Sequence, residues 1–453
     1  MTYSAFIKSK IKTDVDTGIA APLWVSPAAF DFQRDIISWA LRRGRAAIFA
    51  QTGLGKTLME ACWAWNVMAA TNAPILILAP LSVAHQIVRE AAKFGIPAHF
   101  CDSGADVRRE SINVSNYSKL HKFDTSVFSG VVLDESSILK AFDGKIRRML
   151  IGAFARTPYR LAATATPAPN DFMELGNHAE FLGVMSLTGM QATFFTHDGG
   201  DTAKWRLKGH AEMRFWEWMC SWAVLIRKPS DLGYCDEAYV LPPLNEVHHT
   251  VDVEGDLAVT LSQRLRARRN SLDVRVKHAA ELTPPDRPFV WWSNLNDESA
   301  ALAARIPDAV EVRGSDSDSE KERKLEGFSR GEIRVLITKP SICGFGMNWQ
   351  HCADTGFVGL SDSFEQTFQA VRRFWRFGQT KQVNVHYVSA STEGNVRANL
   401  IRKESDAARM GEAMVARMGD ISTRAVRGRG MDYDGYAPNQ ILTLPEWMNH
   451  EMY

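Results

Sequence analysis

The sequence has no excess of charge of either sign and no apolar segment long enough to cross a membrane. Its 453 residues include 53 Lys and Arg against 52 Asp and Glu, for a formal net charge of +1. We therefore do not expect a protein that coats nucleic acid through bulk positive charge, and any such contact must come from locally placed groups. The longest strongly apolar run, from Pro74 to Ala84, is about half of the roughly 20 residues that a membrane-spanning helix needs. No membrane partner is expected.

The sequence also lacks the paired cysteines of zinc ribbons and thioredoxin-type sites. None of its six cysteines forms a Cys-x-x-Cys pair with another. We expect each to be a small buried hydrophobic residue in a reduced protein. The opening segment MTYSAFIKSKIKTDVD has no apolar signal core. Together these features predict a cytoplasmic location.

Strand-like and helix-like segments alternate in both halves of the chain. The expected strands are AAIFA, ILILAP, INVS, VVLDES and YRLAAT in the first half, and FVWWS, AVEV, IRVLIT and VNVHYV in the second. Strands separated by helices are typical of parallel sheets with helices on their faces. With 45% hydrophobic and 23% charged residues, the chain has the composition of an ordinary globular protein. The sequence therefore predicts an α/β fold with two lobes.

Residues 186–240 interrupt this alternation. Phe215, Trp218 and Trp222 follow the spacing of one helical face. We expect a helical insert in which they form a core, in preference to a platform for stacking bases. Leu241-Pro242-Pro243 stops any helix and marks a linker. The predicted domains are an N-terminal lobe over residues 1–185, the insert and linker over 186–240, a C-terminal lobe over 241–430, and a short tail over 431–453.

A glycine-containing loop, AQTGLGKT, follows one expected strand directly and opens an expected helix. This is the setting of a phosphate-binding loop, in which backbone N–H groups and the positive helix end hold phosphates. Gly53 and Gly55 let the backbone wrap the phosphates, Lys56 reaches the outer ones, and the Thr57 hydroxyl ligates Mg²⁺. Ala50 stands where the strict motif has its first glycine. The loop predicts binding of a nucleoside triphosphate with magnesium.

An acidic pair ends the expected strand VVLDES. A magnesium-nucleotide site needs one carboxylate to hold the ion and another group beside the attacking water. Asp134 and Glu135 can supply the two. Upstream, Gln33 has the donor and acceptor that an adenine edge needs. An acidic pair after a strand is common, and an isolated Gln33 would be read as a surface residue. Together with the phosphate loop, however, both indicate a nucleotide site.

The late segment QAVRRFWRFGQ places Arg373 and Arg376 three residues apart, on one face of a helix expected over residues 363–377. Their guanidinium groups could reach phosphate charge from the second lobe and stabilise a transition state across the cleft. The alternative is the solvated basic face of an amphipathic helix.

These segments, in this order, resemble the motor of superfamily-two helicases. They are most similar to its Swi/Snf-like branch of double-stranded DNA translocases, and in particular to compact phage-encoded members. The resemblance runs from about Phe30 to Val388. Its motifs are FDFQ (Q), AQTGLGKT (I), APLSVAHQIVREAAKF (Ia), NVSNYSKL (Ib), LDESSILKAF (II), ATATPAPND (III), LIRKPSDLG with LPP (the branch's arginine-lysine segment and linker), WWSNLNDES (IV), TKPSICGFGMNWQ (V) and EQTFQAVRRFWRFGQTKQVNVHYV (VI). It implies two tandem RecA-like lobes.

The resemblance also implies a role for each matching residue. Those at the nucleotide and its magnesium ion would be Gln33, Thr52, Gly53, Gly55, Lys56, Thr57, Asp134 and Gln369. Catalysis would rest on Lys56, Glu135 and the arginine fingers Arg373 and Arg376. Thr164 and Thr166 would couple hydrolysis to lobe motion. The candidates for contacts to a nucleic-acid backbone are Ser82, Asn116, Tyr117, Asn294, Thr338 and Lys339.

The chain departs from the family pattern at three motifs. Motif II has Ser137 where the family has histidine or aspartate, and motif III has Thr-Ala-Thr where the branch has glycine-threonine. Motif V is about two residues longer between Lys339 and Gly344. The magnesium and water residues are intact, so we expect hydrolysis to be retained.

The expected function is that of an ATP-dependent motor on duplex DNA, with ATP and Mg²⁺ as its cofactors. It would work as a monomer, in the bacterial host cell if it is phage-encoded. The alternatives are a strand-separating or fork-remodelling helicase with its wedge in residues 186–240, a non-catalytic scaffold derived from a motor, and a motor on RNA. A replication, repair or nuclease protein partner would supply specificity, because the two lobes leave no room for a further domain.

Overall fold

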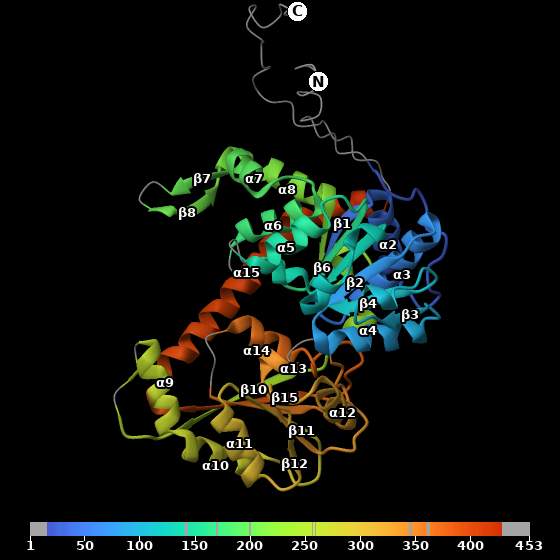
Figure 1. Ribbon diagram of the computed structural model, residues 1–453. Helices are drawn as coiled ribbons and strands as arrows, with labels where there is room; N and C mark the ends of the chain where they lie inside the picture. Colours follow the sequence, from blue (N-terminus) through green and yellow to red (C-terminus); the bar gives the residue numbers. More distant parts are fainter. Residues whose placement is uncertain are drawn as a thin grey trace, which may run out of the picture.

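The computed structural model describes residues 16–140, 144–168, 171–198, 201–255, 257–258, 260–343, 347–359 and 363–427. The expected tail over 431–453 lies outside these residues, as does the part of motif V from residue 344 to 346. Two α/β lobes, each built on a parallel sheet, lie in contact (Figure 1). This confirms the expected fold class of two tandem lobes with parallel sheets flanked by helices. No helix in the described part of the chain is both long and apolar enough to span a membrane.

The N-terminal lobe is built on a parallel sheet with the strand order β3-β4-β2-β5-β6-β1-β9. Its strands are β1 (Arg45–Ala50), β2 (Ile75–Ala79), β3 (Ala98–Phe100), β4 (Ile112–Asn116), β5 (Gly130–Asp134), β6 (Tyr159–Thr164) and β9 (Ala223–Ile226). Side chains alternate between the two faces of a strand. In β1, Ile48 therefore packs into one core and Phe49 into the other. Burial on both faces explains why these strands are almost purely apolar.

Helices cover both faces of this sheet. One face carries α2 (Asp31–Arg43), α3 (Lys56–Thr71) and α4 (Leu81–Lys93), and the other carries α5 (Lys145–Ala153), α6 (Leu175–Leu182) and α8 (Glu212–Trp222). Helix α3 begins directly after the glycine loop that follows β1. Its N-terminus therefore opens at the carboxyl edge of the sheet, where ligands of parallel α/β sheets bind.

The C-terminal lobe repeats this architecture with the strand order β10-β15-β14-β11-β13-β12. Its strands are β10 (Leu244–Val251), β11 (Phe289–Ser293), β12 (Ala309–Glu311), β13 (Val335–Thr338), β14 (Asp354–Val358) and β15 (Val383–Ala390). Its helices are α9 (Leu261–Asn270), α10 (Leu272–Leu282), α11 (Asn296–Arg305), α12 (Asp318–Ser329), α13 (Pro340–Cys343) and α14 (Phe364–Val371). Strand β10 follows the expected Leu-Pro-Pro linker at once. Its sequence does not predict a strand, because its exposed edge position gives it mixed polar and apolar residues.

The expected helical insert over residues 186–240 contains the helices α7 (Leu187–Phe194) and α8 (Glu212–Trp222), and strands as well. After α7, the strands β7 (Phe195–Asp198) and β8 (Asp201–Leu207) pair as an antiparallel hairpin. Strand β9 then joins the N-terminal sheet beside β1. The run AVLI of β9 is four residues long and follows a helix directly, so its sequence is too short to be told apart from a continuation of that helix. The aromatic face of α8 is core, as expected, but it is the core of the N-terminal lobe.

A long helix, α15 (Gly394–Val426), starts in the C-terminal lobe and returns to the N-terminal lobe (Figure 1). Met414 and Met418 pack into the same core as α8, and Val426 packs against the opposite face of the sheet. The chain from residue 241 to 430 therefore does not form one lobe by itself, because the end of α15 covers the other one.

Candidate nucleotide site

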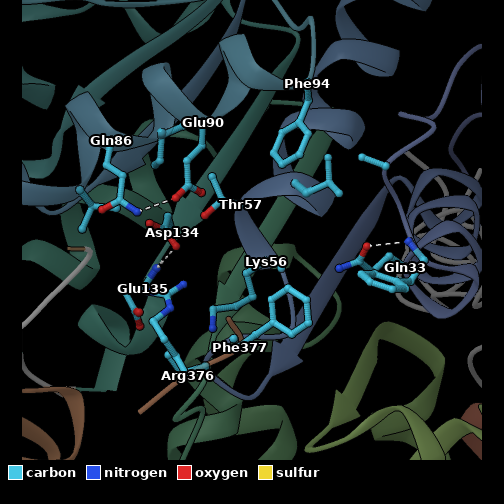
Figure 2. A pocket seen from close by; sticks show the side chains of 18 of the residues that line it. Gln33, Lys56, Thr57, Gln86, Glu90, Phe94, Asp134, Glu135, Arg376 and Phe377 are labelled. Atoms are coloured by element: carbon cyan, nitrogen blue, oxygen red, sulfur yellow. Dashed lines mark hydrogen bonds between the residues drawn. The ribbon is translucent and has the colours of Figure 1, made fainter. Parts of the chain in front are cut away.

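The carboxyl ends of β1 and β5 open onto a cavity of about 250 Å³ between the lobes. Figure 2 shows side chains from both lobes turned into it. The cavity is lined by most of the residues that sequence analysis assigned to the nucleotide and to catalysis. They are Gln33, Thr52, Gly53, Gly55, Lys56, Thr57, Asp134, Glu135, Arg373 and Arg376. Motifs scattered over more than 300 residues of sequence thus come together at one site.

The glycine loop has the backbone that its sequence predicts. Gly53 and Gly55 have φ angles of 95° and 77°, in the left-handed region that favours glycine. A Cβ on Gly55 would also lie 2.3 Å from Gln33 Nε2. Ala50 needs no such freedom, because it is the last residue of an ordinary strand and its carbonyl accepts a 2.9 Å hydrogen bond from Lys56 Nζ. An alanine at the first motif position is therefore compatible with the loop.

The loop fits a bound triphosphate. The buried Thr52 hydroxyl finds no hydrogen-bond partner among the described residues, and the N-terminus of α3 points its free N–H groups to the same place. Burial lowers the pKa of Lys56, while the carboxylates of Glu135, Asp134 and Glu60 raise it again. A buried cation, an unpartnered donor and a helix N-terminus are the groups that phosphate oxygens satisfy.

Gln33 fastens the loop to α2. Its Oε1 accepts the Phe30 N–H at 2.9 Å, and its Nε2 donates to the Leu54 carbonyl at 2.9 Å. The side chain is only 3% exposed. Gln33 lines the cavity as expected, but the main use of its amide is to hold the loop, because both of its ends already have partners in the protein.

An aromatic cluster forms the end of the cavity near Gln33, and sequence analysis did not find it. Tyr239, which follows β9, lies with its ring centre 5.3 Å from that of Phe30 and 4.8 Å from that of Phe377. Phe377 follows Arg376 directly and comes from the C-terminal lobe. Only its place beside the arginine motif could have indicated it, and nothing in the sequence singles out Tyr239. Flat apolar rings beside a phosphate loop can stack on a nucleotide base.

Three carboxyl groups gather beneath the glycine loop. Asp134 ends β5 and is 5% exposed, and burial together with the charge of Glu135 raises its pKa to about 7. Glu60, on α3, is 1% exposed, and burial and the charge of Asp134 raise its pKa well above the usual range. Nothing in the sequence assigned a role to Glu60, although it lies one helical turn after Lys56. Such crowding and burial favour the protonated forms of Asp134 and Glu60.

Glu135 has a φ of 54°, which is uncommon for a non-glycine residue. Strained backbone of this kind is concentrated at functional sites. Its carboxylate accepts a 3.3 Å hydrogen bond from the Thr164 hydroxyl, which in turn accepts the Thr166 N–H at 3.1 Å. The ends of β5 and β6 are therefore connected through the residues to which coupling was assigned. Ser137 is buried and takes no visible part in this connection.

The two arginines do not lie on a helix, so that expectation is wrong. Helix α14 ends at Val371, and Arg373 and Arg376 lie in the turns that follow. The N–H groups of Arg373 and Phe374 bond to carbonyls three residues back, those of Ala370 and Val371, which tightens the chain out of α-helical geometry. This turn carries Phe377 so close to the glycine loop that a Cβ on Gly53 would lie 3.0 Å from its nitrogen.

Gln369 positions Arg373. Its carbonyl accepts Arg373 Nε at 2.9 Å, and its side-chain Oε1 accepts Arg373 Nη2 at 3.1 Å. Gln369 is fully buried and is not among the described residues that line the cavity. Burial lowers the pKa of Arg373 to about 9, so it remains charged at neutral pH. The nucleotide contact expected of Gln369 stays a prediction, and the contacts that the structure shows are those to Arg373.

Three of the residues expected at a nucleic-acid backbone are buried. Asn116 caps a turn by accepting the Lys119 N–H at 3.2 Å, the Tyr117 hydroxyl donates to the Asp134 carbonyl at 2.6 Å, and Thr338 lies against Cys343 Sγ at 3.1 Å. Their polar groups are thus engaged within the protein, and a contact of these three with a nucleic-acid backbone stays a prediction.

The remaining candidates lie closer to the surface. Lys339 is partly exposed, and its Nζ donates to Asn296 Oδ1 at 2.6 Å. The half-buried Asn294 donates to the Gly359 carbonyl at 3.1 Å. Ser82 belongs to the first turn of α4, and its side chain lies outside the described set. Asn294, Lys339 and Ser82 stay predictions.

No protein-family model matches the chain, and no curated protein matches it in sequence. Among solved structures, the chain is similar to the SWI2/SNF2 ATPase core of Sulfolobus solfataricus, solved in complex with double-stranded DNA. The two are 18% identical, the match covers 89% of this chain and 98% of that one, and the TM-score is 0.43. We infer function from the geometry of the site itself.

Proposed function

We propose that the chain is an ATP-dependent motor of the Swi/Snf-like branch of superfamily two, which translocates on double-stranded DNA. One observation carries this proposal. A phosphate loop and a carboxylate pair from one lobe, and two arginines from the other, line a single cavity. Hydrolysis in such a cavity requires both lobes, so it is tied to their relative position.

Each side chain has a task that follows from its place. Lys56 and the N–H groups of the glycine loop would bind the β- and γ-phosphates of ATP, and Thr57 and Asp134 would hold the magnesium ion. That ion, when bound, neutralises charge on the transferred phosphoryl group. Glu135 orients the attacking water and takes up its proton. Arg373 and Arg376 stabilise the charge that develops across the cleft.

Movement along DNA would follow from closing and opening this cleft. The lobes grip phosphates on one strand in turn, and nucleotide shifts the balance between the closed and open states through its different affinity for each. A modest set of phosphate contacts suits such a cycle, because each contact must be released. The near-neutral net charge of +1 is consistent with this, and the salt dependence of binding should be correspondingly shallow.

A strand-separating helicase is the second candidate, because the β7–β8 hairpin projects from the N-terminal lobe (Figure 1). A wedge that splits a duplex needs a projecting element of this kind. Displacement of a triplex-forming strand without unwinding of a forked duplex supports the translocase. Unwinding of the fork without triplex displacement supports the helicase. Lys56→Ala should abolish either activity and serves as the control.

A further inference from the structure

Glu90 on α4 lies in the nucleotide cavity, although neither the phosphate loop nor the arginine motif includes it. Figure 2 shows Glu90 and Gln86 reaching from α4 to the side of the cavity where Thr57 and Asp134 lie. This is the phosphate end of the cavity. A carboxylate is an unexpected lining there, because it repels the phosphates that the rest of the site attracts.

Glu90 joins the two lobes. Its Oε1 accepts the Gln86 amide at 2.7 Å from within α4, and the Asn348 amide at 2.5 Å from the C-terminal lobe. Asn348 follows α13 and lies in motif V. The carboxylate is thus a point inside the cavity where the lobes bond to each other directly.

Unpartnered polar atoms surround this contact. Gln86 Oε1, Asn348 Oδ1 and Arg376 Nε are all buried and find no hydrogen-bond partner among the described residues. Arg376 lines the same cavity, and the charge of Glu90 is the largest of those that raise its pKa against the effect of burial. The contact between the lobes at Glu90 therefore combines an anion from one lobe, a cation from the other, and unpartnered donors and acceptors beside them.

We propose that Glu90 is a positioning residue that holds the lobes closed before nucleotide binds, by bonding Asn348 and by facing the positive charge of Arg376. The phosphate of the nucleotide then becomes the hydrogen-bond partner of Arg376. This second step rests on the proposed function, whereas the first concerns the nucleotide-free protein only.

The distance between the lobes tests the proposal without any reference to activity. Fluorophores on cysteines introduced at Met213 on α8 and Val274 on α10, which are 73% and 44% exposed, report on each lobe. The exposed Cys235 is first replaced by serine, while the other five cysteines are buried. Glu90→Gln removes the charge at nearly constant shape. The matched control is Glu326→Gln, which removes another lobe-to-lobe carboxylate, the partner of Arg89 outside the nucleotide cavity.

Without nucleotide, Glu90→Gln should lower the closed-to-open ratio at least about fivefold, and Asn348→Ala should do the same. Glu326→Gln should change it less than about twofold, because its exposed pair contributes little. An unchanged ratio in Glu90→Gln, or equal shifts in Glu90→Gln and Glu326→Gln, overturns the proposal. Thermal melting shows that each variant is folded.

Added ATP, in a Glu135→Gln background that prevents turnover, should restore the closed state of Glu90→Gln. If the variant binds a fluorescent ATP analogue but stays open, the phosphate does not replace Glu90 and the second step is wrong. If the unmodified chain binds no ATP analogue, the proposed function fails, and the nucleotide-free comparison still decides the role of Glu90.

Discussion

Asp134 is the residue whose environment most directly predicts a pH effect. Its folded pKa of about 7 lies above the ordinary value of 3.8 because it is buried beside Glu135. Between these values the folded state holds a proton that the unfolded state has released. The stability of the nucleotide-free protein should therefore fall as the pH rises from about 4 to about 7. Asp134→Asn removes this loss.

Asp134→Asn should raise the melting temperature of the nucleotide-free protein at pH 8, and the gain should shrink at pH 5. Melting curves at the two pH values measure it. The control is Asp124→Asn, since hydrogen bonds from Ser126 lower the pKa of this exposed carboxyl and give no such gain. An equal gain in melting temperature at both pH values would contradict the raised pKa of Asp134.

Arg373 should matter for the rate and much less for nucleotide binding. Arg373→Ala should lower the turnover number for ATP on the order of 10³-fold, because it removes charge stabilisation in the transition state. Gln369→Ala should lower it about tenfold through misplacement of Arg373. The neighbouring Arg372 stacks on Trp375 at 4.4 Å and does not line the cavity, so Arg372→Ala is the control. Near-normal turnover of Arg373→Ala would remove its assigned role.

At this scale the sequence predicted residues that form compact motifs. The phosphate loop and the acidic pair were found because each has a fixed local spacing and a simple chemistry. Glu60, Glu90 and Tyr239 were not assigned roles, because their place in the site depends on how separate elements pack. The buried state of Tyr117 and Thr338 could not be predicted either, since polar residues at strand ends can face a ligand or close a turn.

Among the elements, α8 is the one whose aromatic residues can be tested either as core or as a surface that binds bases. Trp222 is fully buried, and its ring centre lies 5.3 Å from that of Trp218. Trp222→Ala should cost about 3–5 kcal/mol of unfolding free energy, as large core truncations do. Met213→Ala, at an exposed position of the same helix, should change stability by less than about 0.5 kcal/mol. Urea unfolding measures both, and loss of nucleic-acid binding without loss of stability would show that the tryptophan binds bases.

The elements that the sequence predicted well are those with one clear period or apolar run. Strands β1, β2, β5 and β11 are buried in the middle of their sheets and read as continuous apolar segments. Strand β9 is too short to show a pattern. The hairpin β7–β8 does carry a tight-turn signature, Asp198-Gly199-Gly200, but its flanking strands lack a clear alternation of apolar and polar residues, and the turn was not used as a hairpin signal. The end of α14 was misplaced because the residues after Val371 keep a helical spacing of apolar side chains while their backbone tightens into turns.

At the scale of the whole molecule, the two lobes are connected twice. The chain passes from the N-terminal lobe to the C-terminal lobe before β10, and α15 passes back to pack on α8 and β9. The ion pair of Lys140 with Glu365 and that of Arg89 with Glu326 add contacts between the lobes. A helix fixed in both lobes limits how far they can separate, which suits a motor whose stroke is a small change at one cleft.

In the proposed function, the two lobes together form an ATP-hydrolysing site that responds to nucleic acid. The most direct test is the ATPase rate of the full chain without nucleic acid and with single-stranded DNA, double-stranded DNA or RNA, beside Glu135→Gln. We expect the highest rate with double-stranded DNA and a rate near zero for Glu135→Gln under all conditions. Strict dependence on single strands would contradict the duplex translocase, and the absence of any stimulated hydrolysis would contradict the motor itself.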